Sequence, residues 1–463
     1  MGMGFIGGGG GGGPPSGSAG GDLSGTYPNP SVAKVKGVAV SATAPTAGQV
    51  LTATGAAAAS WQTPGAAAAS PTPYDAKIGT GGDYATVKLA IDAGKRTLLL
   101  VSNVTEAAST PTLADTVVVD LNGWTWTLDT DLTFDTSFLV VRDSRRRLGQ
   151  FVVEAATSGP ASPVLSQLVL IGGRFEARCA FDTTIGGACW ITDSEVRFVG
   201  ESLTANVIGK FAVVVDWINS SLEIVADAGF SPVDCLAFTG GHCDGLTVSG
   251  SPAGRWLHST GESRIENVRV LASVASGFAI TLAAQTGGGS TPGIEGLRSE
   301  GQTCRIGLGH DTAAYAGAVL TDVRCTSIAY DPGPFVDAGE VVDLQLQGVY
   351  LTEYLDLTGA PAGSMRVDLH DVHAPAGAIM IPADVVGVAI VGGEADSLVC
   401  NAEQARVVGF KTVAGMTVDG ARSVVDGCYV GATLTVDTDV IVLGTHYDAI
   451  SGTPAATAAN VEF

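Results

Sequence analysis

A six-residue phrase that recurs fifteen times between Leu121 and Asp448 limits the possible folds of this chain more than any other feature. Its positions hold a large apolar residue, any residue, Gly, Asn or Asp, a small or apolar residue, a polar residue and any residue. Clear copies are Ile265–Val270 (IENVRV) and Leu320–Cys325 (LTDVRC). The copies open at Leu121, Val141, Leu170, Ile191, Trp217, Phe238, Ile265, Ile294, Leu320, Leu346, Leu369, Ile390, Val407, Val425 and Leu443.

The third position of the phrase indicates what the repeat builds. It is Gly, Asn or Asp in every copy except the last, where it is Thr445. These three residue types tolerate the left-handed backbone region, so each copy predicts a tight bend between two short strands. Side-chain alternation then directs the first, fourth and sixth positions inward and the fifth outward. Copies follow one another at intervals of 17 to 29 residues, which is typical of a solenoid with length variation in its loops. The sequence therefore predicts an all-β fold, a right-handed parallel β-helix of about fifteen coils.

The composition agrees with a turn-rich β structure and excludes several classes of function. Only 15% of the residues are charged, 63 are glycines, and the net charge is -22, which argues against nucleic-acid binding. No run of 18 apolar residues is present, so we expect no membrane insertion, and the N-terminus shows no secretory signal pattern. The eight cysteines have no paired spacing, and Cys243, Cys325 and Cys428 fall at inward positions. We expect reduced, buried thiols and assembly in a cytoplasm.

The N-terminal part of the chain differs from the repeats. Residues 1–21 are Gly-rich, which predicts a flexible segment or one that becomes ordered on a partner. Residues 22–65 carry short apolar strips around Val32, Val35, Val38 and Val40, and residues 66–73 read as a linker. The run GGDLSGTYPNPSVAKVKGVAVSATAPTAGQVLTATG resembles a segment near the N-termini of tail fibres and minor tail proteins of tailed bacteriophages. That resemblance covers about a tenth of the chain and implies a docking block that intertwines into a trimer.

The start of the solenoid carries a second resemblance. Residues 74–96 include a short amphipathic helix with Val87, Ala90 and Ile91 on one face, which we expect Asp83 to cap and Gly94 to end. This segment is similar to the start of pectate-lyase-like β-helices, including phage tailspikes, in which the helix covers the open end of the coil. With the repeats, the resemblance to tailspike β-helices spans residues 97–448, and residues 449–463 form a short C-terminal tail.

A search for catalytic motifs finds no phosphate-binding loop, dinucleotide fingerprint, nucleophile elbow or zinc-binding helix motif. His370 and His373 form the one close histidine pair, and we interpret them as polar residues of the coil surface rather than metal ligands. We therefore expect no cofactor and no metal. Tailspike β-helices often cleave polysaccharides, a reaction that needs two carboxylates about 5–10 Å apart, and adjacent coils can supply such a pair. With 46 acidic residues the sequence assigns no particular pair, so catalytic residues stay unknown.

Three tryptophans fall at inward positions of the phrase and are expected in the core rather than at a binding site: Trp124, Trp126 and Trp217. A second set of aromatic residues lies in long inserts between phrases, where a ring can stack on a sugar face: Trp256, Tyr315 and Tyr330.

The other candidates stand at the fifth position, which holds Thr125, Arg145, Arg174, Glu195, Ser221, His242, Arg269, Arg298, Arg324, Tyr350, His373, Glu394, Lys411, Tyr429 and Tyr447. Arg269, Arg298 and Arg324 occupy it in consecutive coils, where stacked like charges repel. Three explanations stay open: pairing with acidic residues of this chain, contact with acids of the next subunit, and binding of an anionic host polymer.

Taken together, these features predict a homotrimeric tail fibre or minor tail protein of a tailed phage, assembled in the host cytoplasm and located in the virion. Residues 1–65 would dock it to other phage tail proteins, and the β-helix would contact a host cell-surface glycan or polymer. The alternative is a tailspike polysaccharide depolymerase, acting as a glycosidase or lyase. A bacterial adhesin is a third possibility, which the missing secretory signal disfavours.

Overall fold

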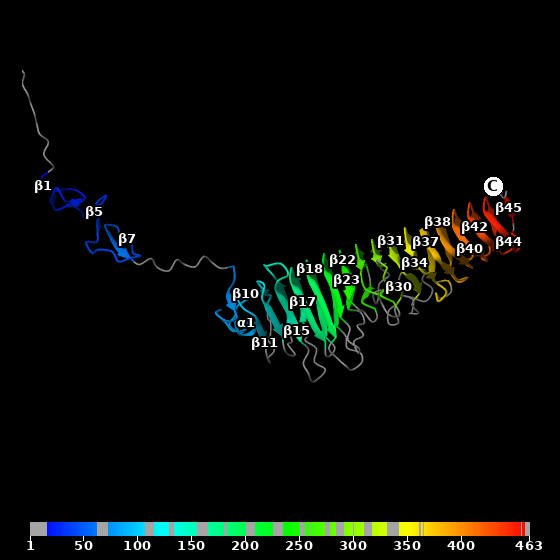
Figure 1. Cartoon of the computed structure of the whole chain (residues 1–463), viewed down its shortest axis with the longest axis horizontal. Helices are drawn as coiled ribbons and strands as arrows, with labels where there is room; N and C mark the ends of the chain where they lie inside the picture. The colour runs from blue at the N-terminus through cyan, green and yellow to red at the C-terminus, as the bar shows by residue number, and fades with distance from the viewer. Residues whose placement is uncertain are drawn as a thin grey trace, which may run out of the picture. The chain divides into compact units, whose positions relative to one another are not determined.

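The fold was analysed in a computed structural model. The described residues are 16–62, 73–106, 115–128, 134–154, 165–179, 183–200, 209–225, 235–250, 255–260, 262–273, 278–283, 291–299, 301–309, 317–330, 342–360, 363, 365–454 and 456–458. The chain divides into two compact units, Met1–Pro73 and Tyr74–Phe463. In its described residues the larger unit is all-β apart from one short helix, and it is a solenoid of parallel strands that advance coil by coil along the chain (Figure 1). The parallel β-helix expected from the repeats is confirmed.

The first sheet of the solenoid holds the strands that precede the bends. In order of pairing these are β9 (Ala76–Ile78), β10 (Thr97–Leu100), β12 (Val117–Asp120), β14 (Phe134–Arg142), β16 (Leu165–Ile171), β18 (Thr183–Thr192), β20 (Gly209–Ile218), β22 (Leu236–Asp244), β25 (Arg264–Glu266), β28 (Gly293–Glu295), β31 (Ala318–Thr321), β34 (Val342–Gln347), β37 (Met365–Ile381), β38 (Gly387–Cys400), β39 (Arg406–Val408), β41 (Val424–Asp426), β43 (Ile441–Leu443) and β45 (Ala456–Ala458).

The second sheet holds the strands that follow the bends. They are β11 (Val104–Glu106), β13 (Thr125–Leu128), β15 (Gln150–Glu154), β17 (Arg174–Cys179), β19 (Glu195–Gly200), β21 (Ser221–Val225), β23 (Thr247–Gly250), β26 (Arg269–Val270), β29 (Arg298–Ser299), β32 (Arg324–Cys325) and β35 (Tyr350–Leu351), then part of β37 and β38, and finally β40 (Lys411–Val418), β42 (Tyr429–Val436) and β44 (His446–Ser451).

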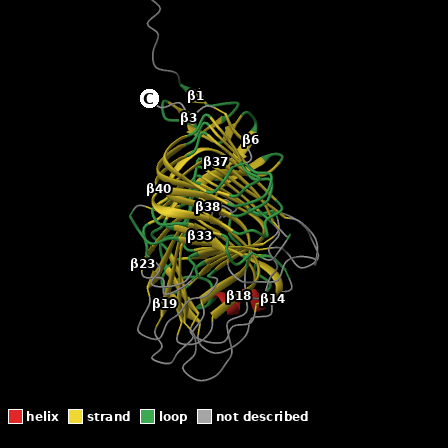
Figure 2. Cartoon of the chain, turned by 90° about the vertical axis from the view of Figure 1, so that its right-hand side faces the viewer, coloured by secondary structure: helices red, strands yellow, loops and turns green. Residues whose placement is uncertain are grey.

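A third run of parallel pairs completes the solenoid. It passes from β22 through β24 (Leu257–Thr260), β27 (Ile280–Ala283), β30 (Arg305–Leu308), β33 (Ser327–Tyr330) and β36 (Leu355–Asp356) to the end of β37. An approximately end-on view shows the strands surrounding a common interior (Figure 2). Because β45 still pairs with β43, strand pairing continues beyond Asp448 into the expected C-terminal tail.

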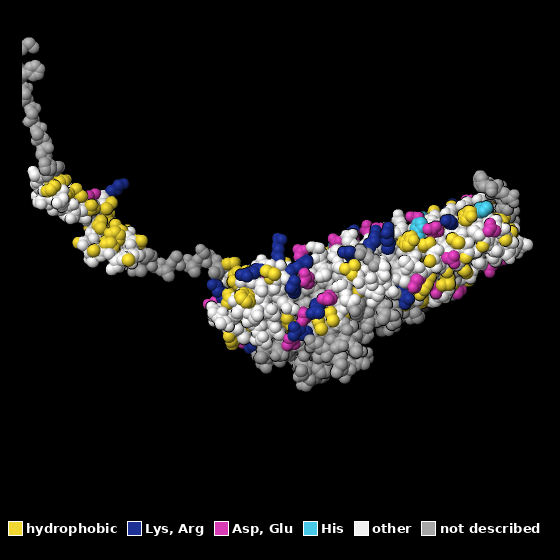
Figure 3. All heavy atoms as spheres, in the orientation of Figure 1, with side chains coloured by type: hydrophobic (Ala, Val, Ile, Leu, Met, Phe, Trp, Pro, Cys, Tyr) yellow, Lys and Arg dark blue, Asp and Glu magenta, His cyan; other side chains and the backbone are white. Residues whose placement is uncertain are grey.

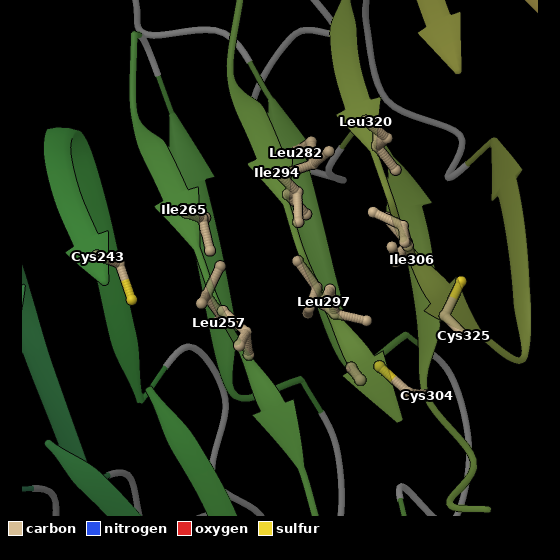
Figure 4. Close-up of a cluster of buried hydrophobic side chains, with 14 of the residues drawn as sticks. Cys243, Leu257, Ile265, Leu282, Ile294, Leu297, Cys304, Ile306, Leu320 and Cys325 are labelled. Atoms are coloured by element: carbon tan, nitrogen blue, oxygen red, sulfur yellow. The ribbon is translucent and has the colours of Figure 1, made fainter. Parts of the chain in front are cut away.

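Most of the fifteen phrase-opening residues stack in one internal column, as the repeat predicts. Paired Cα atoms place twelve of them in this column, with Cys243 on the coil between Trp217 and Ile265, and every one of the twelve is at most 2% exposed: Val141, Leu170, Ile191, Trp217, Ile265, Ile294, Leu320, Leu346, Leu369, Ile390, Val407 and Val425. Figure 4 shows Ile265, Ile294 and Leu320 in this column, with Cys243 on the coil before them. We call this stack the inner column.

Three phrase openers were assigned to the wrong register. Cys243 takes the place expected for Phe238, because CDGLTV fits the phrase as well as the overlapping FTGGHC does. Val442 replaces Leu443, a shift that puts Gly444 at the bend and removes the exception at Thr445. Val119 pairs with Val141 in place of Leu121, although Leu121 is also fully buried.

The expected left-handed bends are present. Positive φ values between 46° and 82° occur at thirteen of the fifteen predicted third positions, namely Gly123, Gly172, Asp193, Asn219, Gly240, Asn267, Gly296, Asp322, Gly348, Asp371, Gly392, Gly409 and Gly427. An ordinary side chain is disfavoured there, which explains the restriction to Gly, Asn and Asp. Asp143 lacks this conformation because it begins a longer bend.

Helix α1 (Val87–Asp92) packs at the start of the solenoid with Val87, Ala90 and Ile91 buried, as predicted. The predicted cap was wrong: the Thr86 side chain accepts the hydrogen bond from Leu89 N–H, whereas Asp83 accepts from Lys77 N–H. Glu106 of β11 also accepts from Val87 N–H at 2.5 Å. Burial raises the pKa of this Glu106 carboxyl. The helix is therefore fastened to the second sheet at its first turn.

The described residues of the smaller unit, 16–62 and 73, include eight short strands: β1 (Gly17–Ser18), β2 (Leu23–Ser24), β3 (Thr26–Tyr27), β4 (Ser31–Val32), β5 (Lys34–Val35), β6 (Val38–Val40), β7 (Val50–Gly55) and β8 (Ala58–Gln62). Several of its apolar side chains face solvent, including Val32 at 62%, Val35 at 54% and Val50 at 49% exposure. Residues 1–15 of the expected Gly-rich segment and most of the expected linker 66–73 lie outside the described residues.

The solenoid core contains the described cysteines and two of the three tryptophans that the repeat predicts there. All seven cysteines with described side chains are buried, and burial raises the pKa of the Cys304 thiol to about 12. Trp126 and Trp217 are fully buried as expected, but Trp124 is 38% exposed. Trp124 follows the bend directly, where the chain has not yet turned inward.

Replacing Leu346 with Asp tests the inner column. The side chain lies between Leu320 and Leu369 and is 1% exposed, so the variant buries a carboxylate without a partner. We expect a loss of roughly 3–5 kcal/mol in stability, measured as a lower midpoint of thermal unfolding by circular dichroism. The matched variant Gln347→Asp puts the same charge on the exposed neighbouring position and should change stability by only about 0.5 kcal/mol. Equal midpoints for the two variants would contradict the register.

Candidate functional site

A column of exposed or half-buried side chains runs along the second sheet, just after the bends. Paired Cα atoms define its members as Thr125, Gln150, Arg174, Glu195, Ser221, Thr247, Arg269, Arg298, Arg324, Tyr350, His373, Glu394, Lys411, Tyr429 and His446. We call it the outer column. Twelve of these residues were predicted. Gln150, Thr247 and His446 take the places expected for Arg145, His242 and Tyr447 because of the register corrections and the longer bend after Val141.

The three arginines at the centre of the outer column stack as the sequence predicted. Arg269 pairs in register with Arg298, and Arg298 with Arg324, so their Cα atoms are about 4.8 Å apart from coil to coil. Arg269 and Arg324 are exposed, and Arg298 is half-buried. Figure 3 shows that Lys and Arg side chains gather in clusters on the visible face of the solenoid rather than spreading evenly.

Stacked arginines elsewhere on this sheet alternate with acids. Arg174 Nε lies 2.8 Å from Glu195 Oε2 on the next coil. Arg197 contacts Glu176 Oε2 at 3.2 Å on one side and Glu223 Oε2 at 3.0 Å on the other. In the Arg269–Arg324 stretch, by contrast, no acid stands between the arginines in the column.

Pairing within the chain is seen for Arg298, the middle arginine of the stack. Arg298 forms an ion pair with Asp322, the bend residue of the next coil, and also donates to the Asp322 carbonyl. Within the described part of the chain, no carboxylate lies within 4.0 Å of the Arg324 guanidinium. Intrachain pairing is therefore confirmed for Arg298 and does not explain Arg324.

Aromatic rings follow the arginines along the same column. Tyr350 stacks on His373 with ring centroids 5.9 Å apart, and Tyr429 stacks on His446 at 4.9 Å. Tyr350 is 41% exposed and Tyr429 48%. Lys411 Nζ lies 3.6 Å from Glu394 Oε2 between the two stacked pairs. The column thus offers cations followed by ring faces at a fixed spacing.

The aromatic residues predicted to bind a ligand are placed differently. Trp256 is fully buried next to β24, and Tyr330 on β33 is 8% exposed within the core. Neither ring offers a face to a ligand at the surface, because both side chains are buried. Tyr315 lies outside the described residues.

A cavity of about 810 Å³ opens on the first sheet near the start of the solenoid. Tyr74, the loop after β14 and the bends of the two following coils line it, with Arg142, Arg146, Arg147, Ile171 and Asp193 among the lining residues. Its volume is in the range typical of small-molecule sites. We call it the loop cavity. Sequence reasoning missed it, although the Arg145–Arg147 run is a conspicuous signal in a chain with 24 basic and 46 acidic residues.

Asp120 forms the buried polar centre of the loop cavity. Its Oδ2 accepts from Tyr74 Oη at 2.6 Å and from Arg142 Nε at 3.1 Å, and its Oδ1 accepts from Asn122 N–H and Ser144 N–H. Burial alone would raise the pKa of Asp120, but these hydrogen bonds outweigh it and hold the pKa below its usual value. Burial and the bond to Asp120 raise the pKa of Tyr74.

The Asp143 carboxylate likewise accepts four hydrogen bonds. Its Oδ1 accepts from Gly123 N–H and Arg145 N–H, and its Oδ2 accepts from Leu148 N–H at 2.8 Å and Gly149 N–H at 2.7 Å. Asp120 and Asp143 lie on adjacent coils, the arrangement that glycoside cleavage would require. A general acid must carry a proton, however, and the hydrogen bonds to Asp120 hold its pKa below the usual value. The Asp143 oxygens are occupied by four backbone N–H donors. Both side chains therefore organise the loop and are poor candidates for catalysis.

The histidine pair behaves as surface polar residues. Within the described chain, His370 contacts Asp368 and His373 contacts Asp371, each at 2.9 Å, and no group of three potential metal ligands is found there.

Across the described residues, no helix has the length and apolar character needed to cross a membrane. Comparisons with protein-family models, curated proteins and solved structures found no match.

Replacing Asp120 with Asn tests the polar centre. The amide can accept fewer of the four hydrogen bonds and leaves Arg142 without its carboxylate, so we expect a loss of about 1–3 kcal/mol at pH 7. Because the pKa of Asp120 is lowered in the folded chain, its contribution is present above the unfolded pKa of about 3.9 and is lost as the pH falls through the folded value.

Chemical unfolding of the wild type and the variant at several pH values measures this difference. The stability gap should narrow below about pH 4. Asp115→Asn, which alters a mostly exposed carboxylate, should show only a small effect at every pH. A gap for Asp120→Asn that stays constant down to pH 2 would contradict the proposed ionisation.

Proposed function

We propose that this chain is a tail fibre or minor tail protein of a tailed bacteriophage, located in the virion, whose solenoid attaches to a glycan or anionic polymer on the host surface. The single observation that carries the attachment role is the outer column. It places Arg269, Arg298 and Arg324 in register, with Tyr350 and His373 stacked beyond them. Arginines spaced coil by coil suit a linear ligand with regularly spaced anionic groups.

The phage assignment is supported by the N-terminal sequence. Residues 20–55 resemble the N-terminal segments of phage tail proteins, and they lie in a compact unit separate from the solenoid. The exposed side chains of Val32, Val35 and Val50 are apolar surface that a monomer leaves in water. We propose that three copies bury this surface together and that residues 1–65 dock the trimer to other tail proteins.

Polysaccharide cleavage is the second candidate for the same solenoid. The strands provide many carboxylates on adjacent coils, but the best enclosed pair, Asp120 and Asp143, is saturated with hydrogen-bond donors. Attachment without cleavage is therefore the function that the geometry supports better.

Changing Arg269, Arg298 and Arg324 together to Gln tests the attachment role. We expect the purified variant to stay folded and trimeric but to bind host cells at least about tenfold more weakly, because it loses three charge-assisted contacts. The measurements are binding to host cells, oligomeric state by light scattering, and chain length of host glycan after incubation. A matched triple change of Arg178, Arg197 and Arg264 to Gln removes the same charge from ion-paired positions outside the outer column and should leave binding nearly unchanged.

The other outcomes are equally informative. Dissociation of the variant would assign the arginines to subunit contacts instead. Undiminished binding of an intact trimer would contradict a role for this column in attachment. Shortening of the glycan by the wild-type protein would identify a depolymerase.

A further inference from the structure

The bend after Val141 is longer than the bends that follow it. From Leu170 to Val442, the inner-column residue and the outer-column residue of the same coil are always four positions apart, as in Leu170 and Arg174 or Val442 and His446. Val141 and Gln150 are nine positions apart. The five additional residues form a loop at a point where the solenoid needs only a tight bend.

Asp143 holds this loop in one conformation. Its carboxylate accepts hydrogen bonds from Arg145, Leu148 and Gly149 N–H groups, and its carbonyl accepts from Arg146 N–H at 3.1 Å. Arg146 and Arg147 consequently adopt left-handed backbones with φ values of 52° and 64°, which long side chains seldom do. Such strain persists only where surrounding contacts enforce it, and it is common at ligand-binding sites.

The arginines around the loop cavity are engaged to different extents. Arg142 binds Asp120 and Tyr74 Oη, and Arg147 donates to the Asp193 carbonyl at 3.0 Å and lies 3.6 Å from Glu195 Oε1. Arg145 donates to Asn122 Oδ1 and is not among the cavity residues. Arg146 lines the cavity and is exposed, and among the described residues its guanidinium has no acidic partner within 4.0 Å.

The remaining lining suits an anionic sugar better than a metal or a purely apolar ligand. Asp120 and Asp143 have their acceptor positions occupied by protein donors, so they attract no cation. Ile171, 43% exposed, offers an apolar surface to the C–H face of a sugar ring, and the exposed Ser144 can donate to or accept from a hydroxyl. The Arg146 guanidinium is a two-pronged donor for a carboxylate or phosphate.

We propose that the loop cavity binds a sugar unit that carries a carboxylate or phosphate, with Arg146 as the residue that binds the acidic group. The site is separate from the outer column. Binding of a free acidic sugar does not depend on attachment to a host, so its success or failure is independent of the proposed function.

The test uses ligand-observed NMR titration of the full-length protein with sodium glucuronate, glucose 6-phosphate and glucose. We expect the acidic sugars to bind with dissociation constants of about 1–10 mM and glucose at least tenfold more weakly. Arg146→Ala should weaken binding of the acidic sugars about tenfold, and Arg146→Lys by less. Arg145→Ala removes the same charge one residue away and should change the affinity by less than about twofold.

Each outcome decides the proposal. Binding of glucuronate alone assigns a carboxylate site, and binding of glucose 6-phosphate alone assigns a phosphate site. Binding of both supports a general acidic-sugar site. The proposal is overturned if neither acidic sugar binds at about 50 mM, if glucose binds equally well, or if Arg145→Ala weakens binding as much as Arg146→Ala does. Equal thermal unfolding midpoints of the variants exclude a folding defect, since both side chains are exposed.

Discussion

Parallel stacking of one coil on the next is the constraint on which the rest of this structure depends. The inner column supplies a large or medium apolar side chain on every coil, and the bend supplies a residue that tolerates a left-handed backbone. Together they keep successive strands in register although the chain between them varies in length. Hydrophobic burial and the inter-strand hydrogen bonds then add coil by coil, which gives solenoids their stability.

The same constraint fixes the chemistry of the surface. From Leu170 to Val442, each outer-column residue follows the inner-column residue of its coil by four positions. Because the inner column is in register, the outer column is in register too, and its side chains form a linear array. The array alternates in charge where Arg174 meets Glu195 and carries like charges on consecutive coils where Arg269, Arg298 and Arg324 follow one another. The longer loop after Val141 does not disturb it, since Gln150 still pairs in register with Thr125 and Arg174. The outer column and the loop cavity are thus separate features of one scaffold, and the two binding proposals can be tested independently.

The sequence predicted the repeat well because each coil makes the same physical demands. Errors arose where two overlapping phrases satisfied those demands, as at Phe238 and Cys243, or where a neighbouring residue did, as at Leu443 and Val442. The sequence did not predict that Trp256 and Tyr330 are buried. Their distance from a phrase does not show whether a residue packs into the core at the third run of strands. The loop cavity could not be predicted, since it depends on how Asp143 folds five additional residues and on Tyr74 from a distant segment.

Distances along the outer column test the stacking most directly. Spin labels can be placed at exposed Arg174 and Lys411, which are ten coils apart, and in a second protein at Arg269 and Lys411, which are six coils apart. Pulsed electron paramagnetic resonance, with labelled chains diluted in unlabelled protein, measures both separations. At about 4.8 Å per coil, the account predicts about 48 Å and 29 Å between the Cα atoms. Two separations that do not scale with the number of coils would contradict it.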